Sequence, residues 1–128
     1  MKPVRQRILI VEGDADNCEA LCLILDSLGY AAECARTGAG ALAVAMAWHP
    51  DFVVLDLGLP DMPGERVAET MKHLPAPPFI VGFSGFHRRE QAARSAGCDA
   101  FVLKPNLEEL LALVAAEMAS RAKAAGDA

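Results

Sequence analysis

The fold of this chain is decided by the stretch DFVVLDLGLPDMPG, residues 51–64. Residues 52–55 form an unbroken apolar run, which is typical of a strand buried on both faces of a parallel sheet. The run ends at a carboxylate, Asp56, and passes into a loop that contains two glycines and two prolines. Because ligands bind at the carboxyl ends of strands in open α/β sheets, Asp56 is the first candidate for a functional residue.

Strand and helix patterns alternate along the rest of the chain. Further short apolar segments predict strands at 7–11, 30–35, 79–83 and 99–103. Apolar residues at helical spacing predict helices over 18–28, 37–49, 65–74, 87–96 and 106–121. This alternation predicts a single doubly wound α/β domain, with a five-stranded parallel sheet and five helices covering both faces. We assign the domain to residues 1–128, with a core at 6–121 and a short disordered C-terminal tail.

Composition narrows the classes of partner. A length of 128 residues fits one domain, and a net charge of −5 argues against direct binding of nucleic acid. No apolar run approaches the roughly 20 residues of a membrane span, and the start lacks the apolar segment of a signal peptide. The sequence therefore predicts a cytoplasmic protein that does not enter a membrane.

Two side-chain patterns carry predictions about the core. Cys18 and Cys22 share a helical face with leucines and lack a CxxC arrangement, so they are interpreted as small core hydrophobes. A zinc site would require a tighter cluster with a histidine nearby. In the second helix, Leu42, Ala45 and Met46 are expected to face inward.

Polar side chains follow four of the predicted strands. Glu12 and Asp14 come after the first strand, Asp56 after the third, Ser84 after the fourth and Lys104 after the fifth. Carboxylates brought together repel one another unless a cation such as Mg²⁺ lies among them. A lysine and a hydroxyl beside them suit phosphoryl transfer, in which catalysis is mostly positioning and neutralisation of anionic oxygens.

These motifs resemble those of a response-regulator receiver domain of two-component signalling, over nearly the whole chain. The matching features are the apolar-to-acidic run 8–14, the Asp-x-x-x-Pro-x-x-x-Gly pattern at 56–64, the hydroxyl at Ser84 and the Lys104-Pro105 pair. The resemblance implies a flavodoxin-like sheet with strand order 2-1-3-4-5. It also implies a cis peptide bond between Lys104 and Pro105.

The resemblance also implies roles for individual residues. Asp56 would be the phosphoacceptor, and Lys104 would contact the phosphoryl oxygens. Ser84 would bond the phosphoryl group in the active state, and Phe101 would be the aromatic switch residue.

The implied Mg²⁺ site departs from the family pattern. Its ligands would be Glu12, Asp56 and the backbone carbonyl of Gly58. Gly13 stands where the family usually has a second acidic residue, so weak Mg²⁺ binding is expected. Asp14 is a further candidate ligand, and its alternative role is to begin the following helix.

The predicted function is a signalling domain that takes a phosphoryl group from a phosphohistidine donor onto Asp56. The donor would be a histidine kinase or a histidine phosphotransfer protein. The domain would signal to a downstream protein, or to a second copy, through the face made by helix four, strand five and helix five. It would catalyse only its own phosphorylation and dephosphorylation.

Three other interpretations fit parts of the sequence. The first is a degenerate receiver that binds partners without phosphate, which Gly13 supports. The second is a Mg²⁺-dependent phosphohydrolase with Asp56 as nucleophile, which would require a second general acid nearby. The third is dinucleotide binding at the GxGxxA pattern 38–43, but this pattern follows the weakest strand and is interpreted as a helix N-terminus.

Overall fold

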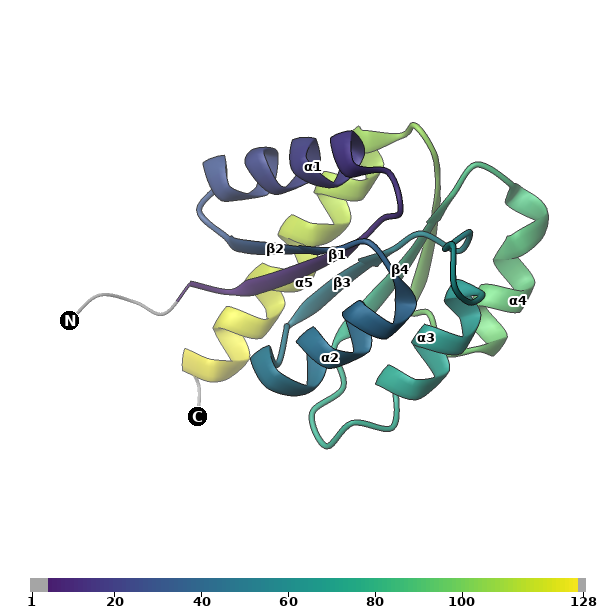
Figure 1. Cartoon of the computed structure of the whole chain (residues 1–128). Helices are drawn as coiled ribbons and strands as arrows, with labels where there is room; N and C mark the ends of the chain where they lie inside the picture. The colour runs from purple at the N-terminus through teal and green to yellow at the C-terminus, as the bar shows by residue number, and fades with distance from the viewer. Residues whose placement is uncertain (1–4, 127–128) are drawn as a thin grey trace.

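The computed structural model describes residues 5–126 and contains one five-stranded parallel sheet with the order β2-β1-β3-β4-β5 (Figure 1). The strands are β1 (Arg7–Val11), β2 (Ala31–Ala35), β3 (Phe52–Leu55), β4 (Phe79–Ser84) and β5 (Ala100–Leu103). The helices are α1 (Ala15–Ser27), α2 (Gly38–Trp48), α3 (Gly64–Met71), α4 (Glu90–Ser95) and α5 (Leu107–Gly126), and a 3-10 turn, η1 (His87–Arg89), precedes α4. The predicted fold class and strand order are confirmed.

Helices cover both faces of the sheet. Helices α1 and α5 lie on one face, and α2, α3 and α4 lie on the other (Figure 1). Successive side chains of a strand point to opposite faces, and each face has its own core cluster. On β3, Phe52 and Val54 belong to the cluster with α1 and α5, whereas Val53 and Leu55 belong to the other. Both faces of this central strand are therefore apolar, which explains its unbroken run.

The strand register brings the functional candidates to one edge of the sheet. Val11 at the end of β1 pairs with Leu55 at the end of β3. Ser84 at the end of β4 pairs with Leu103 at the end of β5. The residues that follow these strands consequently emerge side by side at the carboxyl edge.

Helix α2 differs from the prediction in the face that it buries. Ala41 and Ala45 are fully buried, whereas Met46 is 66% exposed. Small residues allow α2 to pack closely on the sheet, and the larger methionine lies outside that contact. The prediction that Met46 faces inward is wrong.

The C-terminal helix extends further than expected. Residues 122–126 continue α5, so the predicted disorder of the tail after Arg121 is wrong for this segment. Its side chains favour a helix, because alanine has the highest helix propensity and Arg121 bonds Glu117 one turn earlier at 2.9 Å. The last two residues of the predicted tail, 127 and 128, lie outside the described residues.

Helix α4 is shorter than the predicted helix 87–96. The first residues of that segment form η1, and the buried side chain of α4 is Ala93. A contact made by one alanine buries little apolar area.

No helix within residues 5–126 is both long and apolar enough to cross a membrane.

Candidate functional site

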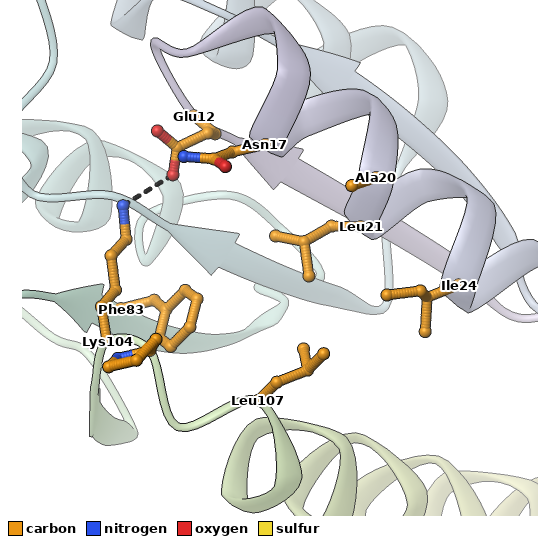
Figure 2. A pocket seen from close by; sticks show the side chains of 9 residues that line it. Glu12, Asn17, Ala20, Leu21, Ile24, Phe83, Lys104 and Leu107 are labelled. Atoms are coloured by element: carbon orange, nitrogen blue, oxygen red, sulfur yellow. Dashed lines mark hydrogen bonds and ion pairs between the residues drawn. The ribbon is translucent and has the colours of Figure 1, made fainter.

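The ammonium group of Lys104, which follows β5, lies close to the carboxylates that follow β1 and β3. The Nζ atom of Lys104 lies 2.7 Å from Oε2 of Glu12 and 3.5 Å from Oδ2 of Asp56. Figure 2 shows Lys104 and Glu12 pointing toward one another from opposite sides of the site. The Glu12 side chain is 6% exposed. Two carboxylates share one ammonium here, so the group keeps a net negative charge that a further cation would offset.

Asp56 is held by the backbone around it. Its N–H donates to the carbonyl of Val11, and its Oδ1 accepts from the N–H of Gly58. The following loop folds closely over it: a Cβ at Gly64 would lie 2.6 Å from both the Asp56 carbonyl oxygen and the Leu57 Cα. Glycine at position 64 is therefore required for α3 to begin directly against the backbone of the candidate phosphoacceptor.

The loop after β1 supplies one carboxylate to the site and one to a helix. Oδ1 of Asp14 accepts from the N–H of Asn17 at 2.9 Å and so caps the N-terminus of α1. This geometry supports the helix-start role rather than the alternative of Asp14 as a metal ligand. Gly13 lies outside the left-handed region, because the positive-φ glycines of residues 5–126 are Gly29 and Gly97.

Ser84 and Phe101, the two predicted switch residues, are both buried, and neither forms a hydrogen bond with the Lys104 side chain. Ser84 is buried at the end of β4, and its Oγ accepts from the N–H of Phe86. Its carbonyl accepts from the backbone N–H of Lys104. Phe101 is buried, and a Cβ at Gly82 would touch its ring at 3.4 Å. The aromatic ring is thus turned inward, and the serine hydroxyl is bonded within its own loop.

The contacts of Arg89 beside the site were not predicted from the sequence. Nη2 of Arg89 lies 2.7 and 2.9 Å from the two carboxylate oxygens of Glu65 and donates to the carbonyl of Leu57 at 3.1 Å. The arginine therefore ties η1 to the start of α3 and to the residue after Asp56. No local pattern could have indicated this contact, because the segments are far apart in the sequence.

A second missed contact anchors α2. The carboxylate of Asp61 accepts from the N–H groups of Gly38 and Ala39 at 2.8 and 3.0 Å. These backbone hydrogen bonds hold the pKa of the exposed Asp61 carboxyl below its usual value. The GxGxxA pattern is thus the capped N-terminus of α2, as interpreted from the sequence, and the β3–α3 loop is attached to it.

A cavity of about 230 Å³ opens beside the ammonium group, between α1 and the start of α5 (Figure 2). Its walls are mostly apolar. They are formed by Glu12, Asn17, Ala20, Leu21, Ile24, Phe83, Lys104, Pro105 and Leu107. The peptide bond between Lys104 and Pro105 is cis, as expected.

The donor atoms at the carboxyl edge suit a hard cation. Carboxylate oxygens of Glu12 and Asp56, with the carbonyl of Gly58, are the type of ligand that Mg²⁺ prefers. Only two acids converge, and residues 5–126 contain no cluster of three histidine, cysteine or acidic side chains arranged to hold a metal. The residues present therefore fit Mg²⁺ chemically.

Comparisons with known proteins agree with this architecture. Residues 8–115 match the family model of the response regulator receiver domain. The transcriptional regulatory protein KdpE of Mycobacterium tuberculosis is 36% identical over 120 residues, which cover 92% of this chain and 53% of KdpE. The polar-differentiation response regulator DivK of Brucella ovis is 28% identical over 106 residues, covering 77% of this chain and 83% of DivK. The chain thus spans about half the length of KdpE.

Solved structures show the same likeness. A CheY-like receiver domain protein of Methanospirillum hungatei has a TM-score of 0.86 at 28% identity, covering 94% of this chain and 98% of that one. The response regulator TrrA of Thermotoga maritima, solved in complex with Mg²⁺ and BeF, has a TM-score of 0.80 at 26% identity, covering 88% and 98%.

The fold and the acid–lysine edge define an α/β signalling domain of the phosphoacceptor class. The chain belongs to the response regulator receiver domain family. Receiver domains are signalling modules of two-component systems. They generally bind Mg²⁺ and interact with histidine kinases or phosphotransfer proteins.

Proposed function

We propose that Asp56 is the phosphoacceptor and that the donor is a phosphohistidine of a histidine kinase or a phosphotransfer protein. A carboxylate oxygen of Asp56 attacks the phosphorus atom, the bond from phosphorus to the imidazole nitrogen breaks, and the histidine leaves. The products are an aspartyl phosphate and a neutral histidine after protonation. The domain catalyses only this reaction and the later hydrolysis of its own phosphoryl group.

The observation that carries this proposal is the position of Lys104. Its ammonium lies between Glu12 and Asp56, nearer to the former. Phosphorylation would increase the negative charge at Asp56, and the ammonium could then turn from Glu12 to the new oxygens. Bound Mg²⁺ would supply additional neutralisation of these oxygens, with Glu12, Asp56 and the Gly58 carbonyl as its holders.

The rival functions lack a comparable observation. A phosphohydrolase would require a second general acid beside Asp56, and the adjacent loop position is Gly58, which has no side chain to act as one. A phosphate-independent receiver is favoured by Gly13 alone, whereas the acid–lysine arrangement is retained.

Intact-mass spectrometry tests the proposal. Incubation with acetyl phosphate and Mg²⁺ should add a single phosphoryl group, and chelation of the metal should slow the addition. A protein that stays unmodified with acetyl phosphate, and also with a phosphorylated histidine phosphotransfer protein, would instead be a phosphate-independent module.

Gly13→Asp is expected to tighten Mg²⁺ binding by up to about tenfold, because it adds a carboxylate beside Glu12 and ligand charge raises affinity for hard cations. The new Cβ would lie 3.4 Å from Pro60 Cδ, an ordinary contact, and position 13 has no left-handed backbone to strain. Isothermal titration with Mg²⁺ measures the change.

Gly126→Asp is the matched control for this substitution. It adds the same charge where a Cβ would meet nothing within 4 Å, at the far end of α5. Equal affinity in the natural protein and in Gly13→Asp would reject the explanation of weak binding by Gly13.

We further propose that the output face consists of α4, β5 and α5, presented to a downstream protein or to a second copy. A phosphoryl group that draws in the Ser84 hydroxyl would break its bond to the Phe86 N–H and pull on the loop that leads to η1. Movement of this loop must also disturb the contact of Arg89 with Glu65. Loss of the Ser84–Phe86 hydrogen bond and of the Arg89–Glu65 ion pair would thereby change the position of α4.

Amide hydrogen exchange checks this switch. Addition of beryllofluoride and Mg²⁺ should change exchange in the segment from β4 through β5, with the largest change in residues 85–96. Changes confined to α1 and α2 would contradict the proposed output face.

A further inference from the structure

Three of the four cysteines meet where α1 packs on β2. Cys18 and Cys22 lie one turn apart on α1, and Cys34 lies on β2. Cys18 and Cys34 are joined by a disulfide, with Cα atoms 6.0 Å apart, and the Sγ of Cys22 lies 2.8 Å from the Sγ of Cys34. The interpretation of Cys18 and Cys22 as simple core hydrophobes is therefore incomplete, because strand β2 supplies a third sulfur that local periodicity cannot indicate.

The fourth cysteine has a different environment. Cys98 is a buried free thiol in the core cluster on the opposite face of the sheet, together with α2, α3 and α4. Cys98 is separated from the other three cysteines by the sheet, so it serves as a reference thiol that takes no part in their chemistry.

We propose that Cys18, Cys22 and Cys34 form a thiol–disulfide exchange site in which Cys34 bonds to either cysteine of α1. The bond first forms when the Cys18 and Cys34 thiols together lose two electrons and two protons to a small-molecule disulfide such as oxidised glutathione, which is reduced to two thiols. In the exchange step, the Cys22 thiolate attacks the Cys34 sulfur. The bond between Cys34 and Cys18 breaks, and Cys18 leaves as a thiolate that takes up the proton Cys22 released.

The geometry that permits exchange is the helical spacing of the two α1 cysteines. Residues four apart lie on the same side of a helix, so both sulfurs can reach the same point on β2. The two attachment points are about 6 Å apart along the helix axis. Exchange would therefore change where α1 is fastened to β2 without changing the fold of either element.

Helix α1 also forms a wall of the cavity beside Lys104, through Asn17 and Leu21 among others (Figure 2). Cys18 and Cys22 directly follow these two residues in the sequence, so the point at which α1 is bonded to β2 is adjacent to the cavity wall. Disulfides are uncommon in reducing compartments, where those that do form are usually transient or redox-sensing.

The environment of the Cys22 thiol determines the rate of exchange. Partial burial and the nearby carboxylates, Asp26 on α1 and Glu33 on β2, raise the pKa of Cys22 to about 11. Little thiolate is present at neutral pH, so exchange should be slow there. Its rate should increase about tenfold per pH unit while the pH stays well below that pKa.

Peptide mapping can identify each linkage. Cleavage after glutamate and arginine separates the three cysteines onto the fragments 13–19, 20–33 and 34–36. The whole chain is incubated with oxidised glutathione at pH 7.5 and at pH 8.5, quenched in acid, digested and analysed by mass spectrometry. The variants are Cys18→Ser and Cys22→Ser, with Cys98→Ser as the matched control, and circular dichroism confirms that each is folded.

The expected result is a bond between Cys34 and Cys22 in Cys18→Ser, and between Cys34 and Cys18 in Cys22→Ser. The natural chain and Cys98→Ser should yield both linked peptides, with the Cys22 linkage forming about tenfold faster at the higher pH. The proposal is overturned if Cys34 in folded Cys18→Ser stays free or carries only glutathione. If that variant does not fold, the natural chain decides, and the Cys18 linkage alone at both pH values overturns the proposal.

Discussion

Asp56→Asn is expected to reduce phosphoryl incorporation to the background level of a reaction without acetyl phosphate. An amide oxygen is a much poorer nucleophile than a carboxylate, and the substitution leaves the surrounding hydrogen bonds available. The fold should persist for two reasons. An asparagine side chain at this position could still accept the hydrogen bond from the Gly58 N–H. The substitution also removes one of two negative charges that repel each other near Glu12. We expect the free energy of unfolding to change by less than about 1 kcal/mol. Incorporation from acetyl phosphate and urea unfolding curves measure the two effects.

Asp61→Asn is the control for that experiment, since Asp61 is another aspartate of the same loop. Its side chain faces the N-terminus of α2 rather than Lys104, so incorporation should remain close to that of the natural protein. If Asp56→Asn were still phosphorylated and Asp61→Asn were not, the assignment of the acceptor to Asp56 would be wrong.

Gly64→Ala is expected to lower the free energy of unfolding by about 3 kcal/mol. The added Cβ would lie 2.6 Å from the carbonyl oxygen of Asp56 and from the Cα of Leu57. Both are backbone atoms, so no side chain can rotate to make room, and the start of α3 must move away from β3. The same movement would displace Asp56 from Lys104 and slow phosphorylation. Urea unfolding reports the stability change.

Gly58→Ala provides the matched comparison for stability. In the same loop, its Cβ would approach only Oδ1 of Asp56, at 3.8 Å. Its free energy of unfolding should stay within about 0.5 kcal/mol of the natural value. If the two alanine variants were equally stable, the close approach at Gly64 would not be a constraint on the fold.

Much of the fold could be predicted because the pattern of burial in the sheet is visible in the sequence. The run 52–55 is apolar at every position, and β3 is buried on both faces in the centre of the sheet. Helix α2 shows why prediction fails elsewhere. Its residues are almost all apolar, so periodicity cannot indicate which side packs, and contact with the sheet is made by Ala41 and Ala45 while Met46 stays outside.

The candidate site was predictable to the extent that it depends on strand ends. Parallel strands bring their carboxyl ends to one edge, and this rule alone predicts that Glu12, Asp56 and Lys104 lie together. The contacts of Arg89 and the meeting of Cys34 with α1 depend on how separate segments pack. Spacing along the chain contains no information about such contacts, and they required the structure.

The central claim is that Asp56 carries the phosphoryl group, and localisation of the modification tests it most directly. The natural protein is treated with acetyl phosphate and Mg²⁺, and the aspartyl phosphate is reduced with borohydride, which converts the modified residue to homoserine. Digestion with trypsin releases the fragment 37–66, and tandem mass spectrometry identifies the converted position. We predict homoserine at position 56 and unmodified aspartate at 51 and 61. Homoserine at either of these other positions, or an unmodified fragment from a phosphorylated protein, would contradict the account.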